Sequence, residues 1–361
     1  MECAHWTRRP ILISDTDALS LSESKFLDEK IKQTFRKSQI ESLFAVQSKT
    51  VPLVLSNPHR DFVVCFPTGS GKTLAYAIPI VQSLMNRVVA RLRALILVPT
   101  RELAVQVSQV FLRITKDFNL KVAVCSGHSS FIEEQKELVD SFQCEHLHGG
   151  STAVDVLITT PGRLVDHLES TPGFTLQHLR FIVVDEADRL LGQGYNEWVS
   201  KVDAALWNAQ QGGIVEDSLG FSRLDAVTYR SHGSPWNRVQ KLLFSATIST
   251  NPSKLAGMKL ENPIYITSSS GSSFSVPETL SEYIIQCDSD SKPMMLAQFL
   301  HSQVRFERTI VFTSSVETTT RLAGLIRLID LGIKSVCFTA SLTKSERIQS
   351  LQAFVEGHVN V

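Results

Sequence analysis

Short apolar runs rich in β-branched residues alternate with longer amphipathic stretches from about residue 60 onward. These runs are apolar throughout, which is typical of strands buried on both faces of a parallel sheet. The predicted strands are Phe62–Phe66, Ala94–Val98, Val122–Cys125, Asp155–Thr159, Phe181–Asp185, Lys241–Ser245 and Ile264–Thr267. Helical patterns at Thr73–Asn86, Arg101–Phe118 and Arg163–Ser170 separate several of them. The sequence therefore predicts an α/β fold, with a parallel sheet covered by helices on both faces.

The alternation breaks at the Ser-rich stretch Ser268–Ser275 and then starts again. This composition is typical of a flexible linker between domains. Beyond it we predict strands and helices, in turn, at Tyr283–Cys287, Lys292–Val304, Thr309–Phe312, Val316–Ile329, Ser335–Phe338 and Lys344–Val355. The predicted organisation comprises an N-terminal extension (1–38), a first domain (39–267) with a polar insertion at about 192–240, a linker (268–279) and a partial second domain (280–361).

Composition limits the classes of protein that fit. The length of 361 residues favours two domains. No apolar run approaches the ~18 residues of a membrane span, and the N-terminus lacks an apolar signal region. With six scattered cysteines and no Cys-x-x-Cys pair, this predicts a soluble, intracellular protein without membrane association. The formal net charge is zero, so nucleic acid would have to be held by a few placed groups rather than by bulk charge.

A phosphate-binding loop is indicated between the first predicted strand and the first predicted helix, at Pro67-Thr68-Gly69-Ser70-Gly71-Lys72-Thr73. Its glycines let backbone N–H groups turn toward phosphate oxygens, and the following helix adds its positive end. Lys72 would reach the β- and γ-phosphates, and the Thr73 hydroxyl would bind Mg²⁺. Phe66 stands where the generic loop pattern has its first glycine, so the flanking strand and helix carry the assignment.

Two carboxylates follow the strand that ends near Val184, in Asp185-Glu186-Ala187-Asp188. Alone, this run reads as the charged start of a helix. With a phosphate loop in the same chain, Asp185 would bind Mg²⁺ and Glu186 would act as general base on an attacking water. Ligands bind at the carboxyl ends of parallel strands, where Ser245-Ala246-Thr247 is also predicted to lie. The combination predicts hydrolysis of a nucleoside triphosphate.

Two further segments each open a helix directly after a strand: Pro99-Thr100-Arg101 and Thr160-Pro161-Gly162-Arg163. Each places a hydroxyl, backbone N–H groups and an arginine at a helix N-terminus, which suits a nucleic-acid phosphate. Taken alone, each favours an ordinary helix cap with a solvated arginine. Their repetition at one edge of the sheet favours a shared role in binding nucleic acid.

These motifs, in this order, resemble those of the DEAD-box RNA helicases: Pro67–Thr73, Pro99–Ala104, Thr160–Leu164, Asp185–Asp188 and Ser245–Thr247. The resemblance implies two RecA-like domains, the second incomplete in this chain, with ATP and Mg²⁺ as cofactors. It implies single-stranded or short duplex RNA as the partner, contacted mainly through its backbone and unwound locally. Ser245, Ala246 and Thr247 would couple the nucleotide state to RNA.

The same resemblance implies that Gln47 recognises the adenine edge. Three residues before it depart from the family pattern: Gln39, Ile40 and Leu43. The aromatic side chain that stacks on adenine in the family is not placed by the sequence, and Phe26 and Phe35 are both candidates.

Trp6, the long insertion and the run 313–319 resemble the ribosome-biogenesis branch of the family. This implies pre-ribosomal proteins as partners, a monomer, and a nuclear or nucleolar location, with the cytoplasm as the alternative. The chain ends before the family's arginine-bearing motifs five and six. Two hypotheses therefore stay open: an ATP-dependent RNA helicase, or a truncated module that binds ATP and RNA without turnover. The RNA-type motifs argue against another class of phosphate-loop enzyme.

Overall fold

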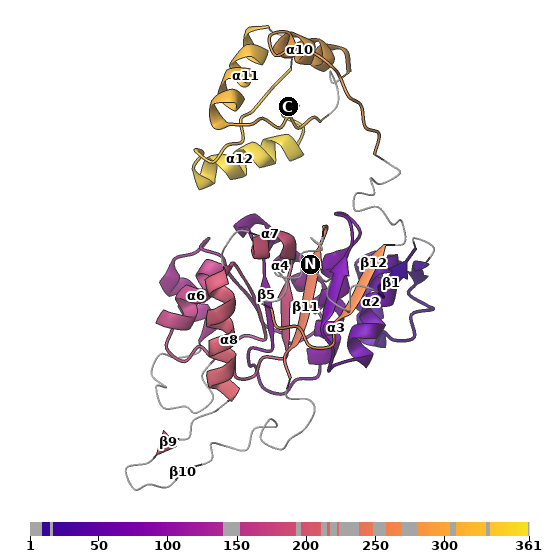
Figure 1. Cartoon of the computed structure of the whole chain (residues 1–361), viewed down its shortest axis with the longest axis vertical. Helices are drawn as coiled ribbons and strands as arrows, with labels where there is room; N and C mark the ends of the chain where they lie inside the picture. The colour runs from indigo at the N-terminus through magenta and orange to yellow at the C-terminus, as the bar shows by residue number, and fades with distance from the viewer. Residues whose placement is uncertain are drawn as a thin grey trace. The chain divides into compact units, whose positions relative to one another are not determined.

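The computed structural model describes residues 9–14, 17–139, 152–192, 196–210, 215–216, 222–223, 238–247, 258–268, 280–303, 308–329, 333–359 and 361. The chain divides into two compact units, Met1–Val276 and Pro277–Val361 (Figure 1).

The first unit is built around an eight-stranded sheet in which every pairing is parallel. The strand order is β1-β12-β4-β11-β8-β5-β7-β6. The bounds are β1 Ile11–Ile13, β4 Phe62–Cys65, β5 Ala94–Leu97, β6 Val122–Cys125, β7 Val156–Thr159, β8 Phe181–Val184, β11 Gln240–Ser245 and β12 Ile264–Ser268. Each predicted strand of the first domain is present to within one residue at either end, which confirms the parallel α/β prediction.

Helices cover both faces of this sheet (Figure 1). Because neighbouring strand residues point to opposite faces, Val64 and Ile96 belong to one hydrophobic core while Val63 and Leu95 belong to the other. The first core includes side chains of α1 (Glu29–Lys37), α2 (Ala45–Ser56), α3 (Lys72–Leu84) and α4 (Arg101–Thr115). The second includes side chains of α5 (Phe131–Leu138), α6 (Pro161–Ser170), α7 (Ala187–Gly192) and α8 (Asn196–Gln210).

The N-terminal segment is part of the first unit from residue 9 onward. Strand β1 pairs with β12, placing Ile11 opposite Ile266, and a two-stranded antiparallel ribbon joins β2 (Leu19–Ser20) to β3 (Ser42–Leu43). Buried side chains on this segment include Ile13, Leu21, Leu27, Ile31 and Phe35. The stretch predicted as an extension at 1–38 thus supplies a strand and a helix that the sequence pattern did not reveal.

The predicted insertion at 192–240 begins with helix α8, which buries Trp198, Val199 and Val202 in the second core. It also contains a short antiparallel ribbon of β9 (Val215–Glu216) and β10 (Ser222–Arg223). Residues 193–195, 211–214, 217–221 and 224–237 of the insertion lie outside the described residues, as do residues 269–279 of the predicted linker.

In the second unit, the helices α10 (Lys292–Gln303), α11 (Val316–Leu328) and α12 (Lys344–Val355) lie where they were predicted. The three strands predicted here are wrong, since Tyr283–Cys287, Thr309–Phe312 and Ser335–Phe338 form no strand ladder within the described residues. Two backbone bonds join the last of them to the chain end, from Val336 N to Val361 O (2.8 Å) and from Val361 N to Lys334 O (3.2 Å).

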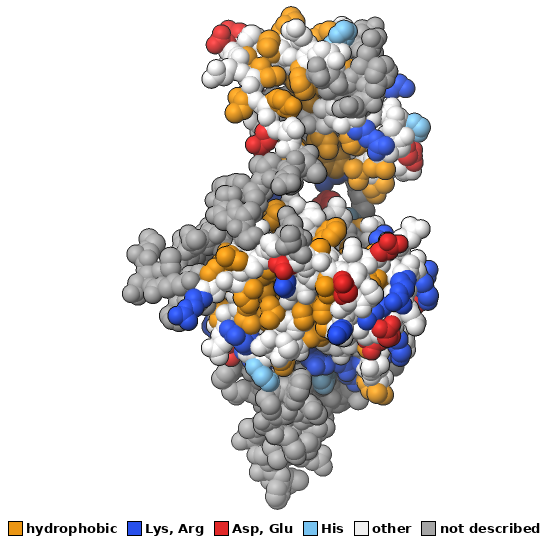
Figure 2. All heavy atoms as spheres, turned by 90° about the vertical axis from the view of Figure 1, so that its right-hand side faces the viewer, with side chains coloured by type: hydrophobic (Ala, Val, Ile, Leu, Met, Phe, Trp, Pro, Cys, Tyr) orange, Lys and Arg blue, Asp and Glu red, His pale blue; other side chains and the backbone are white. Residues whose placement is uncertain are grey.

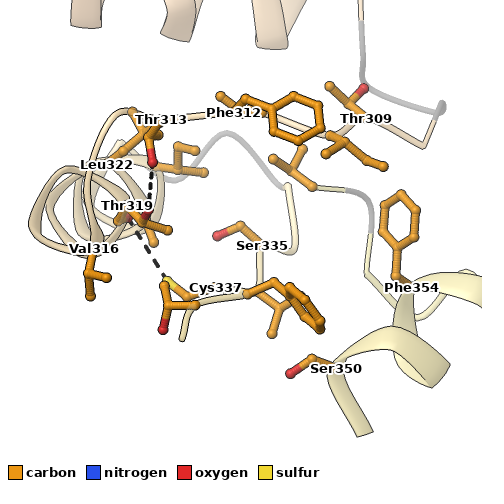
Figure 3. Close-up of a pocket in the computed structure, with 18 of the residues that line it drawn as sticks. Thr309, Phe312, Thr313, Val316, Thr319, Leu322, Ser335, Cys337, Ser350 and Phe354 are labelled. Atoms are coloured by element: carbon orange, nitrogen blue, oxygen red, sulfur yellow. Dashed lines mark hydrogen bonds between the residues drawn. The ribbon is translucent and has the colours of Figure 1, made fainter. Parts of the chain in front are cut away.

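A strand requires a neighbour that accepts and donates along its whole length, and such neighbours are missing from the described part of this unit. Apolar side chains that were predicted to be buried in a sheet therefore lie at the surface of the second unit: Ile310 is 66% exposed and Phe312 is 91% exposed. Hydrophobic side chains gather on the face of this unit shown in Figure 2. A cavity of about 610 Å³ is lined by the extended segments together with α11 and α12 (Figure 3).

Candidate nucleotide and nucleic-acid site

Three predicted motifs meet at the carboxyl ends of adjacent strands. In the sheet order, β11 lies between β4 and β8, so Ser245-Ala246-Thr247 lies between the phosphate loop and Asp185. Direct contacts bear this out: the Cys65 thiol donates to Ala246 O (3.5 Å), and the Thr247 hydroxyl donates to Asp188 Oδ2 (2.6 Å). Because the strands are parallel, residues more than a hundred positions apart in the chain lie together at the carboxyl edge of the sheet.

The phosphate loop takes a conformation that only glycine adopts without strain at two positions. Gly69 and Gly71 have φ values of +82° and +87°, in the left-handed region. Helix α3 begins directly afterwards at Lys72, whose Nζ donates to the loop carbonyls of Phe66 (2.7 Å) and Pro67 (2.9 Å). Burial lowers the pKa of Lys72, and the nearby Asp185 carboxylate opposes that shift.

The loop offers polar groups to a ligand. The Ser70 hydroxyl is buried and has no hydrogen-bond partner in the described part of the chain, a costly state that a phosphate oxygen would relieve. Gln47 holds the loop from the other side, because its Nε2 donates to Gly71 O (3.1 Å) while its Oε1 accepts from Phe44 N (2.9 Å). A Cβ atom on Gly71 would overlap Gln47 Nε2, so this close contact needs glycine.

Asp185 is 5% exposed and is held by two hydrogen bonds. Its Oδ2 accepts from the Tyr76 hydroxyl (2.9 Å) and its Oδ1 from Glu186 N (2.9 Å). Burial raises the pKa of Asp185, while the bond from Tyr76 and the charge of Lys72 oppose the rise. The Thr73 side chain opposes the rise that burial causes in the pKa of Tyr76. Thr73 and Asp185 thus both lie near the Tyr76 hydroxyl and supply the oxygen ligands that Mg²⁺ prefers.

Glu186 projects differently from its neighbour. Its backbone has φ +50°, which is uncommon for a residue with a side chain. The carboxylate is 43% exposed and lies 3.6 Å from Arg189 Nη1, so it is open to solvent and available to a water molecule. Within the neighbouring motif, the Ser245 hydroxyl donates to Thr247 O (2.8 Å), which links β11 to the contact that Thr247 makes with Asp188.

The helices α4 and α6 follow β5 and β7, which are adjacent in the sheet, so their N-termini lie at neighbouring positions on the same edge. The Thr100 hydroxyl caps α4 by accepting from Leu103 N (3.2 Å), as the ordinary-cap alternative expected. Thr160 makes no side-chain cap bond, and Pro161 occupies the first turn of α6. Space is open around the Gly162 Cα.

Arg163, expected to bind a nucleic-acid phosphate, is instead paired with a carboxylate. Its Nε lies 2.6 Å from Glu134 Oε2, and its guanidinium stacks 4.8 Å above the ring of Phe131. The side chain is 19% exposed. The guanidinium of Arg101 lies close to Gly127: a Cβ atom built on that glycine would be 3.3 Å from Arg101 Cζ.

Glu134 is the functional candidate that sequence reasoning missed. It is 1% exposed although charged, and it accepts hydrogen bonds from Gly127 N (2.9 Å) and from the ring of His167 (3.1 Å). The signal for its burial is the spacing to Leu138, four residues on and on the same face of α5, which is also buried.

Cys125, Glu134 and His167 bring one ligand atom each within 4.8 Å of one another, so a metal ion was considered. The carboxylate already accepts three donors, one of them the Arg163 cation, and this supplies the counter-charge that a metal would bring. Burial also raises the pKa of the Cys125 thiol, and the charge of Glu134 adds to the rise. The cluster fits a closed hydrogen-bond network better than a metal centre.

Of the aromatic candidates for stacking on adenine, Phe35 is fully buried in the core and cannot contact a nucleotide. Phe26 is half-buried against the same core. Phe44, which the sequence did not suggest, is 54% exposed and lies beside Gly71.

A parallel sheet with a glycine-shaped phosphate loop and two carboxylates at one edge defines the class of phosphate-loop nucleotide-binding proteins. The family model described as DEAD/DEAH box helicase matches residues 44–255. DEAD-box ATP-dependent RNA helicase 1 of Arabidopsis thaliana is 38% identical over 383 residues, covering 99% of this chain and 72% of the relative. Human ATP-dependent RNA helicase DDX51 is 33% identical, covering 96% and 55%. The chain belongs to the family of DEAD-box ATP-dependent RNA helicases, as its motifs predicted.

Solved structures support the fold. Mss116p bound to ssRNA and AMP-PNP matches with a TM-score of 0.74 at 21% identity, over 95% of this chain and 65% of that one. S. cerevisiae Dbp5 bound to RNA and ADP BeF3 matches with a TM-score of 0.66 at 20% identity, over 95% and 74%. The RecA-like parallel α/β architecture is confirmed. None of the described helices has the length and apolar character needed to cross a membrane.

Proposed function

We propose that this protein hydrolyses ATP in response to RNA and uses the cycle to separate short RNA duplexes. The observation that carries the proposal is the pairing of a phosphate loop with Asp185 and Glu186 at adjacent strand ends. The relatives named above, from Arabidopsis thaliana and Homo sapiens, are both ATP-dependent RNA helicases by name.

The residues divide the chemistry between them. The backbone N–H groups from Thr68 to Thr73 and the hydroxyl of Ser70 bind phosphate oxygens, and Lys72 exchanges its loop carbonyls for the β- and γ-phosphates. Thr73 and Asp185 would hold Mg²⁺, which neutralises charge on the phosphates when bound. Glu186 accepts the proton of the attacking water.

Gln47 supports base recognition in this proposal. Its amide lies between Phe44 and the phosphate loop, so binding of the adenine edge would be sensed directly by the loop. The exposed ring of Phe44 makes it the better placed aromatic for contact with the base.

RNA binding is assigned to the N-termini of α4 and α6, through Pro99, Thr100, Arg101, Thr160, Gly162 and Arg163. Backbone N–H groups at helix N-termini suit phosphates and carry no sequence information, which fits a helicase that acts on the RNA backbone. Ser245, Ala246 and Thr247 transmit the nucleotide state through the Thr247–Asp188 contact.

We further propose a monomer that acts in ribosome biogenesis, with pre-ribosomal proteins as partners and a nuclear or nucleolar location. The support is the resemblance to that branch and the similarity to DDX51 and to dbp6 of Schizosaccharomyces pombe, which is 35% identical. The proposed domain organisation keeps the predicted linker at 268–279 and the second domain after it, whereas the first domain includes β1 and so begins before residue 39. No observation favours the alternative of a non-catalytic module.

The test is Glu186→Gln in the full chain. RNA-stimulated ATP hydrolysis should fall by about 10²–10⁴, the usual contribution of a general base, while affinity for a fluorescent ATP analogue is kept. The matched control is Glu169→Gln, an exposed carboxylate on the far end of α6, which should leave turnover unchanged. Turnover that survives in the Glu186 variant, or that ignores RNA in the unaltered protein, would refute the proposal.

A further inference from the structure

The strongest unexplained feature is the buried carboxylate of Glu134. A charge removed from water is tolerated only where opposite charge and hydrogen bonds replace the solvent. Glu134 meets this condition with donors from three places. Its Oε1 accepts from Gly127 N (2.9 Å), while its Oε2 accepts from Arg163 Nε (2.6 Å) and lies 3.1 Å from His167 Nε2.

These donors belong to two different segments of the chain. Gly127 lies in the loop after β6, whereas Arg163 and His167 lie in the first two turns of α6. His167 is itself fixed, because its Nδ1 pairs with the Thr171 hydroxyl (2.8 Å) and its ring stacks on Phe131 at 4.6 Å. Glu134 therefore joins the β6 loop to the N-terminal half of α6.

The pairing also changes what Arg163 can do. Its charge is compensated at 2.6 Å and its guanidinium face is covered by Phe131, so it is not a free cation awaiting a phosphate. The groups left open at this end of α6 are neutral: the uncapped Thr160 hydroxyl and the first-turn N–H groups beside Gly162.

We propose that Glu134 is a positioning residue of the RNA-binding surface. It holds Arg163 and the β6 loop so that the N-terminus of α6 presents its N–H groups and the Thr160 hydroxyl to RNA phosphates. Arg163 acts through this arrangement rather than by gripping a phosphate. The inference rests on the proposed RNA-binding function and deepens it.

The direction in which Glu134→Gln changes RNA affinity distinguishes a positioning role from a purely electrostatic one. Glu134→Gln removes a negative charge close to the proposed path of the RNA backbone, so charge alone predicts tighter binding. A glutamine keeps an acceptor for Gly127 but turns its NH₂ group toward two other donors, Arg163 and His167. Positioning therefore predicts weaker binding, by about five- to tenfold.

The experiment measures affinity of the full chain for a fluorescent oligouridylate over a series of salt concentrations. Glu133→Gln is the matched control: it removes the same charge one residue away, at an exposed position where glutamine keeps the helix cap with Ser130. It should bind RNA as tightly as the unaltered protein, or slightly more tightly. Thermal denaturation and binding of a fluorescent ATP analogue confirm that each variant is folded.

Arg163→Ala gives a second, independent measurement. If Arg163 only positions other groups, affinity falls while the slope of log affinity against log salt stays the same. If it contacts a phosphate, the slope becomes shallower by about 0.7, the value for one contact with a single strand. A shallower slope, or Glu134→Gln binding RNA at least as tightly as the unaltered chain, overturns the inference.

The network can also be followed without RNA. The hydrogen bond that His167 donates to Glu134 opposes the fall that burial causes in the pKa of His167, so Glu134→Gln should lower this pKa further, as measured by NMR of the imidazole. An unchanged pKa would overturn the inference while leaving the proposed function intact. Failure of the unaltered protein to bind RNA would overturn the proposed function itself, and the inference with it.

Discussion

The carboxyl edge of the sheet has two halves, the phosphate loop with Asp185 and the N-terminus of α6 with Glu134. Their polar side chains differ in whether they are hydrogen-bonded to one another. Around the phosphate loop, within the described residues, the Ser70 hydroxyl is buried without a partner and Lys72 Nζ donates to carbonyls of its own loop. Around α6, by contrast, the buried carboxylate of Glu134 is paired with Arg163 Nε and with the ring of His167. Both halves are held at the ends of strands of the same sheet.

The difference indicates which groups in each half contribute to the free energy of ligand binding. Groups left unsatisfied are destabilising until a ligand binds them, which makes nucleotide binding strong and dependent on single side chains. Groups that satisfy one another stabilise the fold and leave backbone N–H groups for the ligand, so RNA binding should be spread over several weak contacts. Single substitutions should therefore have large effects in the first half and small ones in the second.

The largest effect is expected for Lys72→Ala. It removes the cation that reaches the phosphates, so ATP hydrolysis should fall at least about a hundredfold, as for other preorganised groups that stabilise charge, and binding of a fluorescent ATP analogue should be lost. Lys49→Ala is the control, because it removes an equal charge from an exposed ion pair with Asp17 and should change neither quantity. An ATP affinity unchanged in the Lys72 variant would contradict the site assignment.

A smaller effect is expected for Tyr76→Phe, which keeps the ring packed against Phe244 and removes the hydroxyl. Mg²⁺ binds the ionised form of Asp185. Burial raises the pKa of this carboxyl group, and the hydrogen bond from the Tyr76 hydroxyl opposes that rise. Without that hydroxyl the pKa rises further, so the acid limb of the pH–rate profile for ATP hydrolysis should move to higher pH, with little change on the plateau.

Tyr265→Phe is the control for this shift. Its hydroxyl lies near Thr267 and Cys65 rather than near the catalytic carboxylate, so the acid limb should stay where it is in the unaltered protein. An acid limb that does not move in the Tyr76 variant would show that Asp185 does not set it.

The smallest effect is expected for Thr171→Val, in the half whose groups satisfy one another. The variant loses two hydrogen bonds of the Thr171 hydroxyl, one with His167 Nδ1 (2.8 Å) and one from Gln135 Nε2 (3.2 Å), which together should cost about 2 kcal/mol in the free energy of unfolding. RNA affinity should change by less than about twofold, because the bond between Glu134 and Arg163 remains. Urea denaturation and RNA titration measure the two quantities. If Thr171→Val lowered RNA affinity but left the free energy of unfolding unchanged, the proposed difference between the phosphate-loop half and the α6 half would be wrong.

Much of the first unit followed from sequence because its strands are buried on both faces and therefore apolar throughout. The exception is β1, whose three residues pair with β12 some 250 positions later. Nothing local marks Ile11–Ile13 as a strand, since its partner lies far along the chain. The strands of the second unit failed for the converse reason: Thr309–Phe312 and Ser335–Phe338 have the composition of strands but lack a ladder within the described residues.

The candidate site divides in the same way. Gly71, Lys72 and Asp185 could be placed from sequence because their chemistry depends on local order, a loop between a strand and a helix. Glu134 could not, since its role comes from contacts with Gly127 and Arg163 that only the folded sheet brings together. Its sequence context, Ser130-Phe131-Ile132-Glu133-Glu134, reads as the capped start of an ordinary surface helix.

The position of β4 within the sheet has a consequence for protein synthesis. This strand carries the phosphate loop, and its two neighbours, β11 and β12, are the last strands of the first unit to be made. Such non-local pairings form late and slowly. A ribosome must therefore have translated through Ser268 before the loop is held between its neighbours, so the nascent chain should gain the ability to bind ATP in one late step rather than gradually as the chain grows.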